Sequence, residues 1–202
     1  MNVLRLTDWR TPATLYPRVA CGRARVKRIR YAKGIYDCYG VGGYQYYECL
    51  RTIGVTALQI SRKIWMVDDV PHFLAMTEHA ACYSGRVVVA GLGLGLIVHE
   101  LQANPAVTEI IVVEIERDVI DLIGPQLKPE KLQIVQGDFR DWDGEADGIF
   151  YDLFVGNGHE LRHEAKLVFL RLCAQFQQVE TIRIHGFDNT VLARMRREIF
   201  GT

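Results

Sequence analysis

The chain has 202 residues, of which 49% are apolar and 24% charged, and its formal net charge is zero. These values are typical of globular proteins and exclude a wholly disordered chain or a collagen-like fibre. No apolar run reaches the roughly 18–20 residues that span a bilayer, and the first residues have no apolar stretch of signal-peptide length. The five cysteines include no Cys-x-x-Cys pair, so neither a disulfide framework nor a zinc ribbon is indicated. We expect a soluble, cytoplasmic protein with reduced thiols and no membrane contact.

The zero net charge conceals a basic N-terminal arm. Residues 1–33 contain nine Lys or Arg and a single acid, whereas residues 34–202 contain 15 basic and 23 acidic residues. The basic residues concentrate over 18–33, where they could bind a nucleic acid or another polyanion. The plainer alternatives are a solvated strand face, or an arm that docks on an acidic surface of this protein or of a neighbour. Basic and apolar residues alternate here, and the phase slips at Arg28, which predicts a β-bulge.

Residues 1–82 are predicted to form a β-rich N-terminal region. Tyr, Gly and β-branched residues are frequent, and Gly40, Gly42 and Gly43 mark a turn. The expected strands are 23–31, 44–49, 54–60 and 63–67. A helix over roughly 70–82 closes this region.

Residues 83–202 are predicted to form a separate Rossmann-like domain. Apolar runs alternate with helical patterns, which is typical of a parallel sheet covered on both faces. The expected strands are 86–90, 109–114, 132–135, 148–152 and 180–184. The first expected helix follows the glycines after strand 86–90 and continues through residue 103. Further helices are expected near 116–124, 160–177 and 189–199. Right-handed crossovers then give an α/β, doubly wound fold.

A glycine-rich loop follows the first of these strands and opens a helix. Its glycines, Gly91, Gly93 and Gly95, allow a sharp turn and close approach of a ligand to the backbone. Glu114 ends the next strand, where an acid can accept both ribose hydroxyls of a nucleoside. The alternatives are a tight structural turn for the glycines and a surface acid for Glu114.

The order G-x-G-x-G departs from the G-x-G-x-x-G of dinucleotide sites, since Leu96 stands where the last glycine would be. It resembles motif I of the class I S-adenosylmethionine-dependent methyltransferases. The segment from Gln136 to Phe139 resembles the place where those enzymes bind adenine through an acid. This resemblance implies S-adenosylmethionine as cofactor and Asp138 as the adenine residue. A turn or helix-capping role is the alternative for Asp138.

The N-terminal region is similar to that of the spermidine synthases. Tyr44-Gln45 matches a Tyr-Gln pair of that family, and Val89 stands where motif I of other methyltransferases has an acid. The pairs Asp68-Asp69 and Glu78-His79 match the family only loosely. The resemblance covers about residues 44–155 and implies that Gln45 contacts the cofactor.

Two departures from the spermidine synthases affect the predicted reaction. The family's Asp in the glycine loop is replaced by Leu94, and of its two acids after the fourth strand only Asp152 remains. A dicationic amine needs several carboxylates, because desolvated ammonium groups must be paired. We therefore favour methyl transfer, with Asp152 as the catalytic residue that orients or deprotonates an acceptor.

Residues 159–163 read His-Glu-Leu-Arg-His and fit the zinc-protease pattern H-E-x-x-H. The pattern is short, no third ligand is evident, and it follows the fourth strand of a nucleoside fold. We interpret it as a polar first helical turn and predict no metal.

Only 18 residues follow Ile184, which leaves no room for the two further strands that complete a methyltransferase sheet. The sheet should therefore end after its fifth strand. Its open edge must be covered by the N-terminal strands, the last helix or a partner chain, and we predict a homo-oligomer.

Three functions remain open. The first is an S-adenosylmethionine-dependent methyltransferase with a spermidine-synthase-like layout. The second is an aminopropyltransferase that uses decarboxylated S-adenosylmethionine. The third is a protein that binds or degrades the nucleoside without transfer. The sequence does not identify the acceptor, which could be a small amine, a nucleic acid or a protein.

Overall fold

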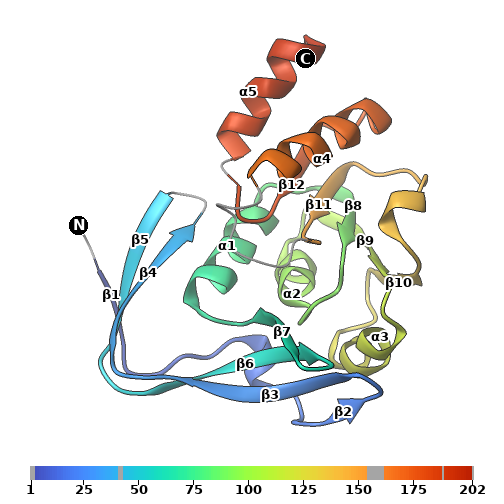
Figure 1. Cartoon of the computed structure of the whole chain (residues 1–202). Coiled ribbons are helices and arrows are strands. Elements are labelled where there is room, and N and C mark those ends of the chain that lie inside the picture. Colours follow the sequence, from blue (N-terminus) through green and yellow to red (C-terminus); the bar gives the residue numbers. More distant parts are fainter. Residues whose placement is uncertain (1–2, 41–42, 154–161, 188, 202) are drawn as a thin grey trace.

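The computed structural model describes residues 3–40, 43–153, 162–187 and 189–201, although not the side chains at 37–40, 43–45 and 162 (Figure 1). The C-terminal part contains a sheet of five parallel strands in the order β10-β9-β8-β11-β12. Its strands are β8 (Gly85–Ala90), β9 (Val107–Glu114), β10 (Leu132–Gln136), β11 (Gly148–Tyr151) and β12 (Thr181–Ile184). Numbered along the chain this order is 3-2-1-4-5, which is the doubly wound order and confirms the predicted Rossmann-like class.

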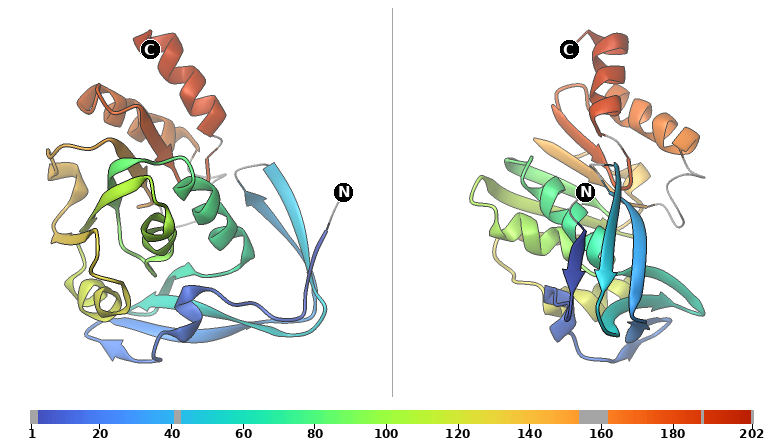
Figure 2. Two further views of the ribbon diagram at one scale, coloured as in Figure 1. Left: turned by 180° about the vertical axis from the view of Figure 1, so that it is seen from behind. Right: turned by 90° about the vertical axis from the view of Figure 1, so that its left-hand side faces the viewer.

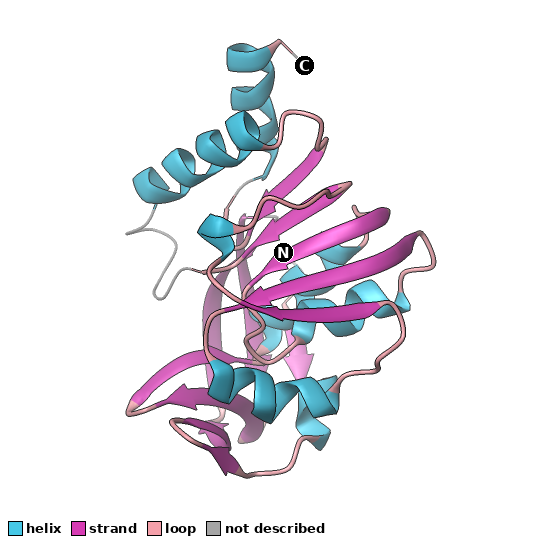
Figure 3. Ribbon diagram, turned by 90° about the vertical axis from the view of Figure 1, so that its right-hand side faces the viewer, coloured by secondary structure: helices cyan, strands magenta, loops and turns pink. Residues whose placement is uncertain are grey.

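Helices cover both faces of this sheet (Figure 3). One face carries α1 (Val70–Ala80), α2 (Leu96–Ala103) and α3 (Arg117–Ile123), and the other carries α4 (Arg162–Gln175) and α5 (Asn189–Phe200). Successive residues of β8 alternate between the two cores, with Val87 and Val89 in one and Val88 and Ala90 in the other. Burial on both faces explains why the four consecutive residues 87–90 of this strand are all apolar. Short 3-10 turns span Pro12–Leu15 (η1), Gly124–Gln126 (η2) and Phe139–Asp141 (η3).

The N-terminal region forms two further sheets. The first has the order β2-β3-β6-β7 and is called the basal sheet below; it contains β2 (Ala20–Cys21), β3 (Ala24–Tyr31), β6 (Ile53–Ile60) and β7 (Lys63–Val67). The second has the order β1-β5-β4 and contains β1 (Leu4–Leu6), β4 (Gly34–Gly40) and β5 (Gly43–Cys49). Because β3 leads into β4 and β5 into β6, the two ladders form one bent ribbon whose upper arm rises beside α1 (Figures 1 and 2).

The predicted bulge in β3 is wrong. β3 pairs with β6 without a register shift over its whole length, and the irregularity lies between β6 and β7, at Leu58/Gln59. The change of phase instead reflects a change of buried face along a twisted ribbon. Val26 packs in the core beneath the parallel sheet, whereas Ile29 and Tyr31 pack against the separate core beside β1 and β5.

Residues on both sides of position 82 share one hydrophobic core. Val26 and Leu58 of the basal sheet pack there with Leu94 and Val98 of the glycine loop and α2. Tyr16 adds a polar link, because its hydroxyl donates to the carbonyl of Leu94 at 3.0 Å. The glycine loop is therefore supported from below by the N-terminal region.

The sheet ends at β12, as predicted. Among the described strands only β11 pairs with β12, and α5 returns toward it, with Arg196 Nη2 donating to the Gln177 carbonyl at 3.0 Å. The homo-oligomer inferred from this open edge stays a prediction. Within the described part of the chain, no helix has the length and apolarity needed to cross a membrane.

Candidate functional site

The glycine loop lies at the carboxyl end of β8, beside β11, where the strand order of the sheet reverses. Gly91, Gly93 and Gly95 have φ values of 91°, 53° and 68°, in the left-handed region that favours glycine. A Cβ on Gly91 would lie 3.2 Å from the carbonyl oxygen of Asp152. Ligands of doubly wound folds bind at such a reversal point, outside the carboxyl ends of the strands.

Glu114 connects the glycine loop to the loop after β9. Its side chain is buried, since the residue is only 8% exposed, which excludes the surface-acid alternative. One carboxylate oxygen accepts the Leu92 N–H at 2.8 Å and the other accepts the Glu116 N–H at 2.8 Å. Each oxygen keeps a further lone pair, so the carboxylate can still accept ligand hydroxyls.

Asp138 follows β10 and caps η3. Its carboxylate accepts the Arg140 N–H at 2.9 Å and forms an ion pair with the Arg140 guanidinium. The hydrogen bonds from Arg140 lower the pKa of Asp138 to about 2. The capping role is therefore present, and it leaves a permanently charged acceptor at the end of the third strand of the fold.

Asp152 directly follows β11, and its N–H donates to the Ala90 carbonyl at 3.3 Å. Burial raises the pKa of Asp152 to about 6, although the nearby positive charge of His72 opposes the shift. Among the described side chains, none donates a hydrogen bond to this carboxylate. Asp152 is thus a carboxyl group poised to change its charge near neutral pH.

Met66 of β7 covers the glycine loop, which the sequence did not predict. Its sulfur accepts the Leu94 N–H at 3.2 Å, and a Cβ on Gly93 would lie 2.7 Å from it. The basal sheet therefore supplies one wall of the site through a flexible thioether side chain.

Asp69 and His72, at the start of α1, form a second polar group beside Asp152. One Asp69 oxygen caps the helix and contacts His72 Nδ1 at 3.3 Å, while the other accepts the Tyr31 hydroxyl at 2.9 Å. Burial alone would lower the pKa of His72, but the hydrogen bond and charge of Asp69, with the charges of Asp152 and Asp68, raise it. The His72 side chain remains 33% exposed, so the ring is partly open to solvent.

Two further histidines extend this group along the sheet. The His185 ring lies 4.9 Å from that of His72 and 6.0 Å from that of His79, and Arg183 lies 3.4 Å from His79 Nδ1. Burial lowers the pKa of both His79 and His185 to about 3, so both rings are neutral near pH 7. The sequence analysis did not predict this cluster. The sequence feature that could have indicated it is the seven-residue spacing of His72 and His79, which places both on one face of the predicted helix.

The remaining predicted residues are not brought to the site by the described structure. Gln45 belongs to β5, but its side chain lies outside the described residues, as do His159, Glu160 and Leu161 of the H-E-x-x-H pattern. His163 lies exposed in the first turn of α4. In the part of the chain that is described, no three His, Cys, Asp or Glu side chains are grouped to hold a metal ion.

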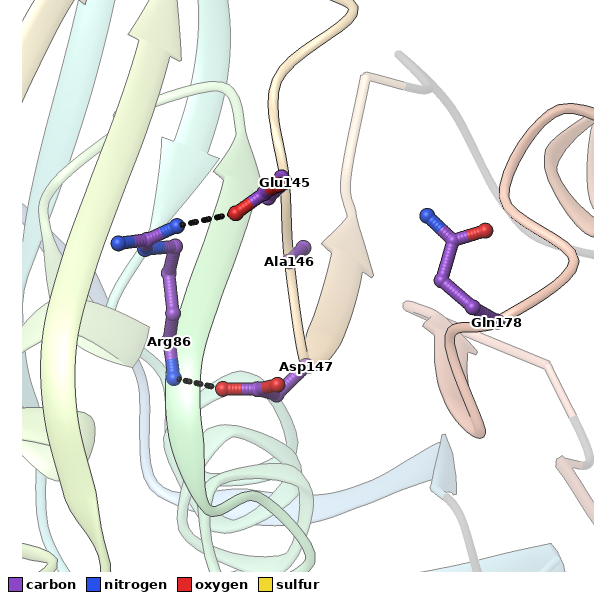
Figure 4. Close-up of a pocket in the computed structure, with 5 residues that line it drawn as sticks. All are labelled: Arg86, Glu145, Ala146, Asp147 and Gln178. Carbon is purple, nitrogen blue, oxygen red and sulfur yellow. Dashed lines mark hydrogen bonds and ion pairs between the residues drawn. The ribbon is translucent and has the colours of Figure 1, made fainter.

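A small polar pocket of about 220 Å³ lies at the opposite end of the parallel strands (Figure 4). Arg86, at the start of β8, lines it with Glu145, Asp147 and Gln178. The Arg86 guanidinium pairs with Glu145 at 3.4 Å, and its backbone N–H donates to Asp147 at 2.7 Å. These internal contacts satisfy the charged groups of the pocket, and it lies away from the glycine loop.

No family model and no curated protein matches the chain. Many solved structures resemble parts of it, among them the following three. One chain in the complex of the Haloferax volcanii Trm112 methyltransferase activator with a candidate methyltransferase is 17% identical over 40% of this chain and 38% of its own, with a TM-score of 0.36. A candidate RNA methyltransferase of Pyrococcus horikoshii is 19% identical over 50% and 56%, with a TM-score of 0.39. Spermidine synthase of Thermotoga maritima is 15% identical over 60% and 55%, with a TM-score of 0.38.

Each likeness therefore spans less than two thirds of the neighbour's length. The fold assignment does not depend on these partial likenesses, because the order and direction of the strands in this chain define it. The class that fold and site define is a Rossmann-like protein with a glycine loop and acidic strand ends.

Proposed function

We propose that the chain is an S-adenosylmethionine-dependent transferase, with methyl transfer as its reaction. The observation that carries the proposal is the position of the glycine loop, Glu114, Asp138 and Asp152 at the carboxyl ends of four neighbouring strands. This arrangement offers a close backbone approach, a buried acceptor for ribose hydroxyls and a charged acceptor for an adenine amino group.

The residues present fit this cofactor. The second lone pairs of the Glu114 oxygens would accept the ribose hydroxyls, and Asp138 would accept the adenine amino group. The methionine part would lie along the glycine loop, where Met66 must move aside or contact it. The cofactor, when bound, supplies a methyl group on a sulfonium leaving group. The chain has to hold both reactants in line and exclude water.

Asp152 is the residue we assign to the acceptor. It lies at the β8–β11 reversal point, and the Asp69–His72 pair lies beside it. Asp69 is already paired with His72, so Asp152 is the carboxylate at the β8–β11 reversal point to which no described side chain donates a hydrogen bond. A single unpaired carboxylate suits one amine or hydroxyl better than a dicationic polyamine. This favours methyl transfer over aminopropyl transfer, which is the second candidate.

Calorimetric titration with S-adenosylmethionine, its decarboxylated form and S-adenosylhomocysteine tests the proposal. We expect binding of the first and third and weak binding of the second. Preference for the decarboxylated form would support aminopropyl transfer, and no binding of any of them would contradict the proposal. Conversion of S-adenosylmethionine without an acceptor, detected by mass spectrometry, would indicate a degrading enzyme.

Variants assign the binding to this site. Glu114→Gln should weaken S-adenosylmethionine binding at least tenfold, because an amide donor replaces an acceptor that faces hydroxyl groups. Glu130→Gln is the matched control, since Glu130 is an exposed acid in the loop before β10. Equal affinities for the two variants would exclude Glu114 from the site.

The pH dependence of turnover tests the role of Asp152. If its carboxylate orients or deprotonates the acceptor, the rate should fall as the pH is lowered through about 6, because the carboxyl group becomes protonated there. Asp152→Asn should reduce the rate while leaving the affinity for S-adenosylhomocysteine within about twofold, and it should remove this pH step. Equal losses of rate and affinity would instead make Asp152 a binding residue.

A further inference from the structure

The basal sheet has an unusual charge distribution. None of its four strands contains an Asp or Glu. Seven basic residues lie between positions 18 and 33, and three more lie between 51 and 63. The three cations between 51 and 63 lie outside the basic N-terminal arm in the sequence. They join the same sheet only because β6 and β7 pair alongside β3.

Internal ion pairs neutralise little of this charge. Arg23 pairs with Glu116 at 2.6 Å and with Asp118 at 3.7 Å, so the arm docks on an acidic surface of the protein at this point. Arg28 donates to the Thr56 hydroxyl instead of to an acid. The remaining cations on or beside the sheet form no ion pair with any described carboxylate. They are Arg18, Arg25, Lys27, Arg30, Lys33, Arg51, Arg62 and Lys63.

Strand geometry places two of these cations on the same face of β3. Arg25 and Lys27 lie on one face of β3, two residues and about 6.6 Å apart. The turn that carries Arg62 and Lys63 lies beside the start of β3, because the Ser61 N–H donates to the Arg23 carbonyl at 2.8 Å. The two cations of the β6–β7 turn therefore lie next to the end of β3 that carries Arg25.

An exposed aromatic side chain lies on β7, the edge strand of the basal sheet, beside one of these cations. Trp65 of β7 is 45% exposed, and the Lys63 ammonium lies 5.9 Å from its ring centroid. The next residue, Met66, packs against Gly93. An aromatic ring beside a row of cations is the combination that binds single-stranded nucleic acid, because bases stack on the ring while phosphates meet the cations.

We propose that the outer surface of the basal sheet binds single-stranded nucleic acid, with phosphates along the cations of β3 and the β6–β7 turn and a base stacked on Trp65. Double-stranded nucleic acid fits less well, because its bases are already paired and stacked and cannot stack on Trp65. This binding does not depend on the transferase activity. The position of Trp65 next to Met66 would bring the strand to the wall of the glycine-loop site.

The test is fluorescence anisotropy with a labelled 12-nucleotide oligouridine, measured between 50 and 200 mM salt. We expect affinity to fall steeply with salt, by about 0.7 in the logarithmic slope for each phosphate contact. Arg25→Gln/Lys27→Gln should reduce that slope by about 1.4. Trp65→Ala should weaken binding roughly tenfold and leave the slope unchanged.

The matched control is Lys166→Gln/Arg171→Gln, which removes two exposed cations from α4 on the far side of the molecule. Circular dichroism verifies that each variant is folded. Absence of binding at 50 mM salt would overturn the proposal, and so would an equal loss in the control. A higher affinity for anionic phosphatidylserine vesicles than for the oligouridine, unchanged by Trp65→Ala, would also overturn it. The surface would then face a membrane.

Discussion

Glu114 is a buried acid whose side chain makes two hydrogen bonds to the backbone. Both of its oxygens accept backbone N–H groups at 2.8 Å, one from the glycine loop and one from the loop after β9. Glu114→Ala would leave two buried donors unpaired, and each costs about 1–3 kcal/mol. We expect the free energy of unfolding to fall by about 2–4 kcal/mol in urea denaturation. A loss below about 1 kcal/mol would mean that water replaces the carboxylate at both donors.

His79 is fully buried, and its protonation should contribute to acid unfolding. Its Nδ1 lies 3.4 Å from Arg183, and its Nε2 has no partner among the described residues. Burial lowers the folded-state pKa of His79 and of His185 to about 3, below the value of 6.5 for an unfolded chain. The unfolded state therefore binds more protons between about pH 3 and 6.5, so these two groups lower the stability as the pH falls through this window.

His79→Asn keeps an acceptor for Arg183 but removes one titrating ring. The slope of unfolding free energy against pH should then decrease by about 1.4 kcal/mol per pH unit between pH 4 and 6. Asp152 affects this slope in the opposite sense, because its folded-state pKa is raised to about 6. Its effect is the same in the wild-type protein and in the His79→Asn variant, so it does not change the difference between them. Denaturant titrations at several pH values measure the difference, and identical slopes would show that His79 gains solvent access before unfolding.

At the residue scale, the sequence predicted the part of the site that lies on single strand ends. Gly91, Glu114, Asp138 and Asp152 each follow an apolar run, so their common edge could be inferred from strand direction alone. Met66 and His185 could not be inferred in this way. Their positions depend on how β7 and β12 pack against elements far away in the chain, and no local pattern encodes such packing.

The contact between β7 and the glycine loop joins two elements that are separate in sequence. Gly93 has a φ of 53°, and a Cβ there would lie 2.7 Å from the Met66 sulfur. Gly93→Ala should therefore destabilise the protein through both backbone strain and the clash, by about 1–3 kcal/mol. Met66→Ala removes the clash but not the strain. In that background we expect Gly93→Ala to cost at least about 0.5 kcal/mol less, measured by a double-mutant cycle in urea. Additive losses would contradict the contact.

The elements themselves were largely predictable, and the exceptions have physical reasons. The three central strands of the parallel sheet, β9, β8 and β11, contain continuous apolar runs, so they stand out in the sequence. β1, β2 and β4 were not predicted. The three-residue β1 pairs in parallel with β5, more than 40 residues away, so its partner could not be inferred from the local sequence. The phase of β3 was misinterpreted as a bulge, because the sequence does not reveal that opposite faces of one strand are buried in two different cores.

The whole molecule should unfold as one unit, although its sequence suggested a boundary at 82/83. The core beneath the parallel sheet contains Val26 and Leu58 from one side of that boundary and Leu94 and Val98 from the other. Loss of either part would expose the apolar surface of the other, so neither has an independent core at this interface.

Tryptophan fluorescence can test this cooperativity, because the probes lie on both sides of the boundary. Trp9 donates to the Asp68 carbonyl at 2.6 Å in the N-terminal region, and Trp142 stacks on Phe139 at a ring-centroid distance of 6.0 Å beside the parallel sheet. We expect single-tryptophan proteins that retain either probe to have the same urea midpoint as the far-ultraviolet circular dichroism of the same protein. If, within one of these proteins, fluorescence and circular dichroism gave different midpoints, the N-terminal region would unfold separately. The shared core would then contribute less than its burial implies, and the glycine loop would lose its support from Tyr16 and Met66 before the parallel sheet unfolds.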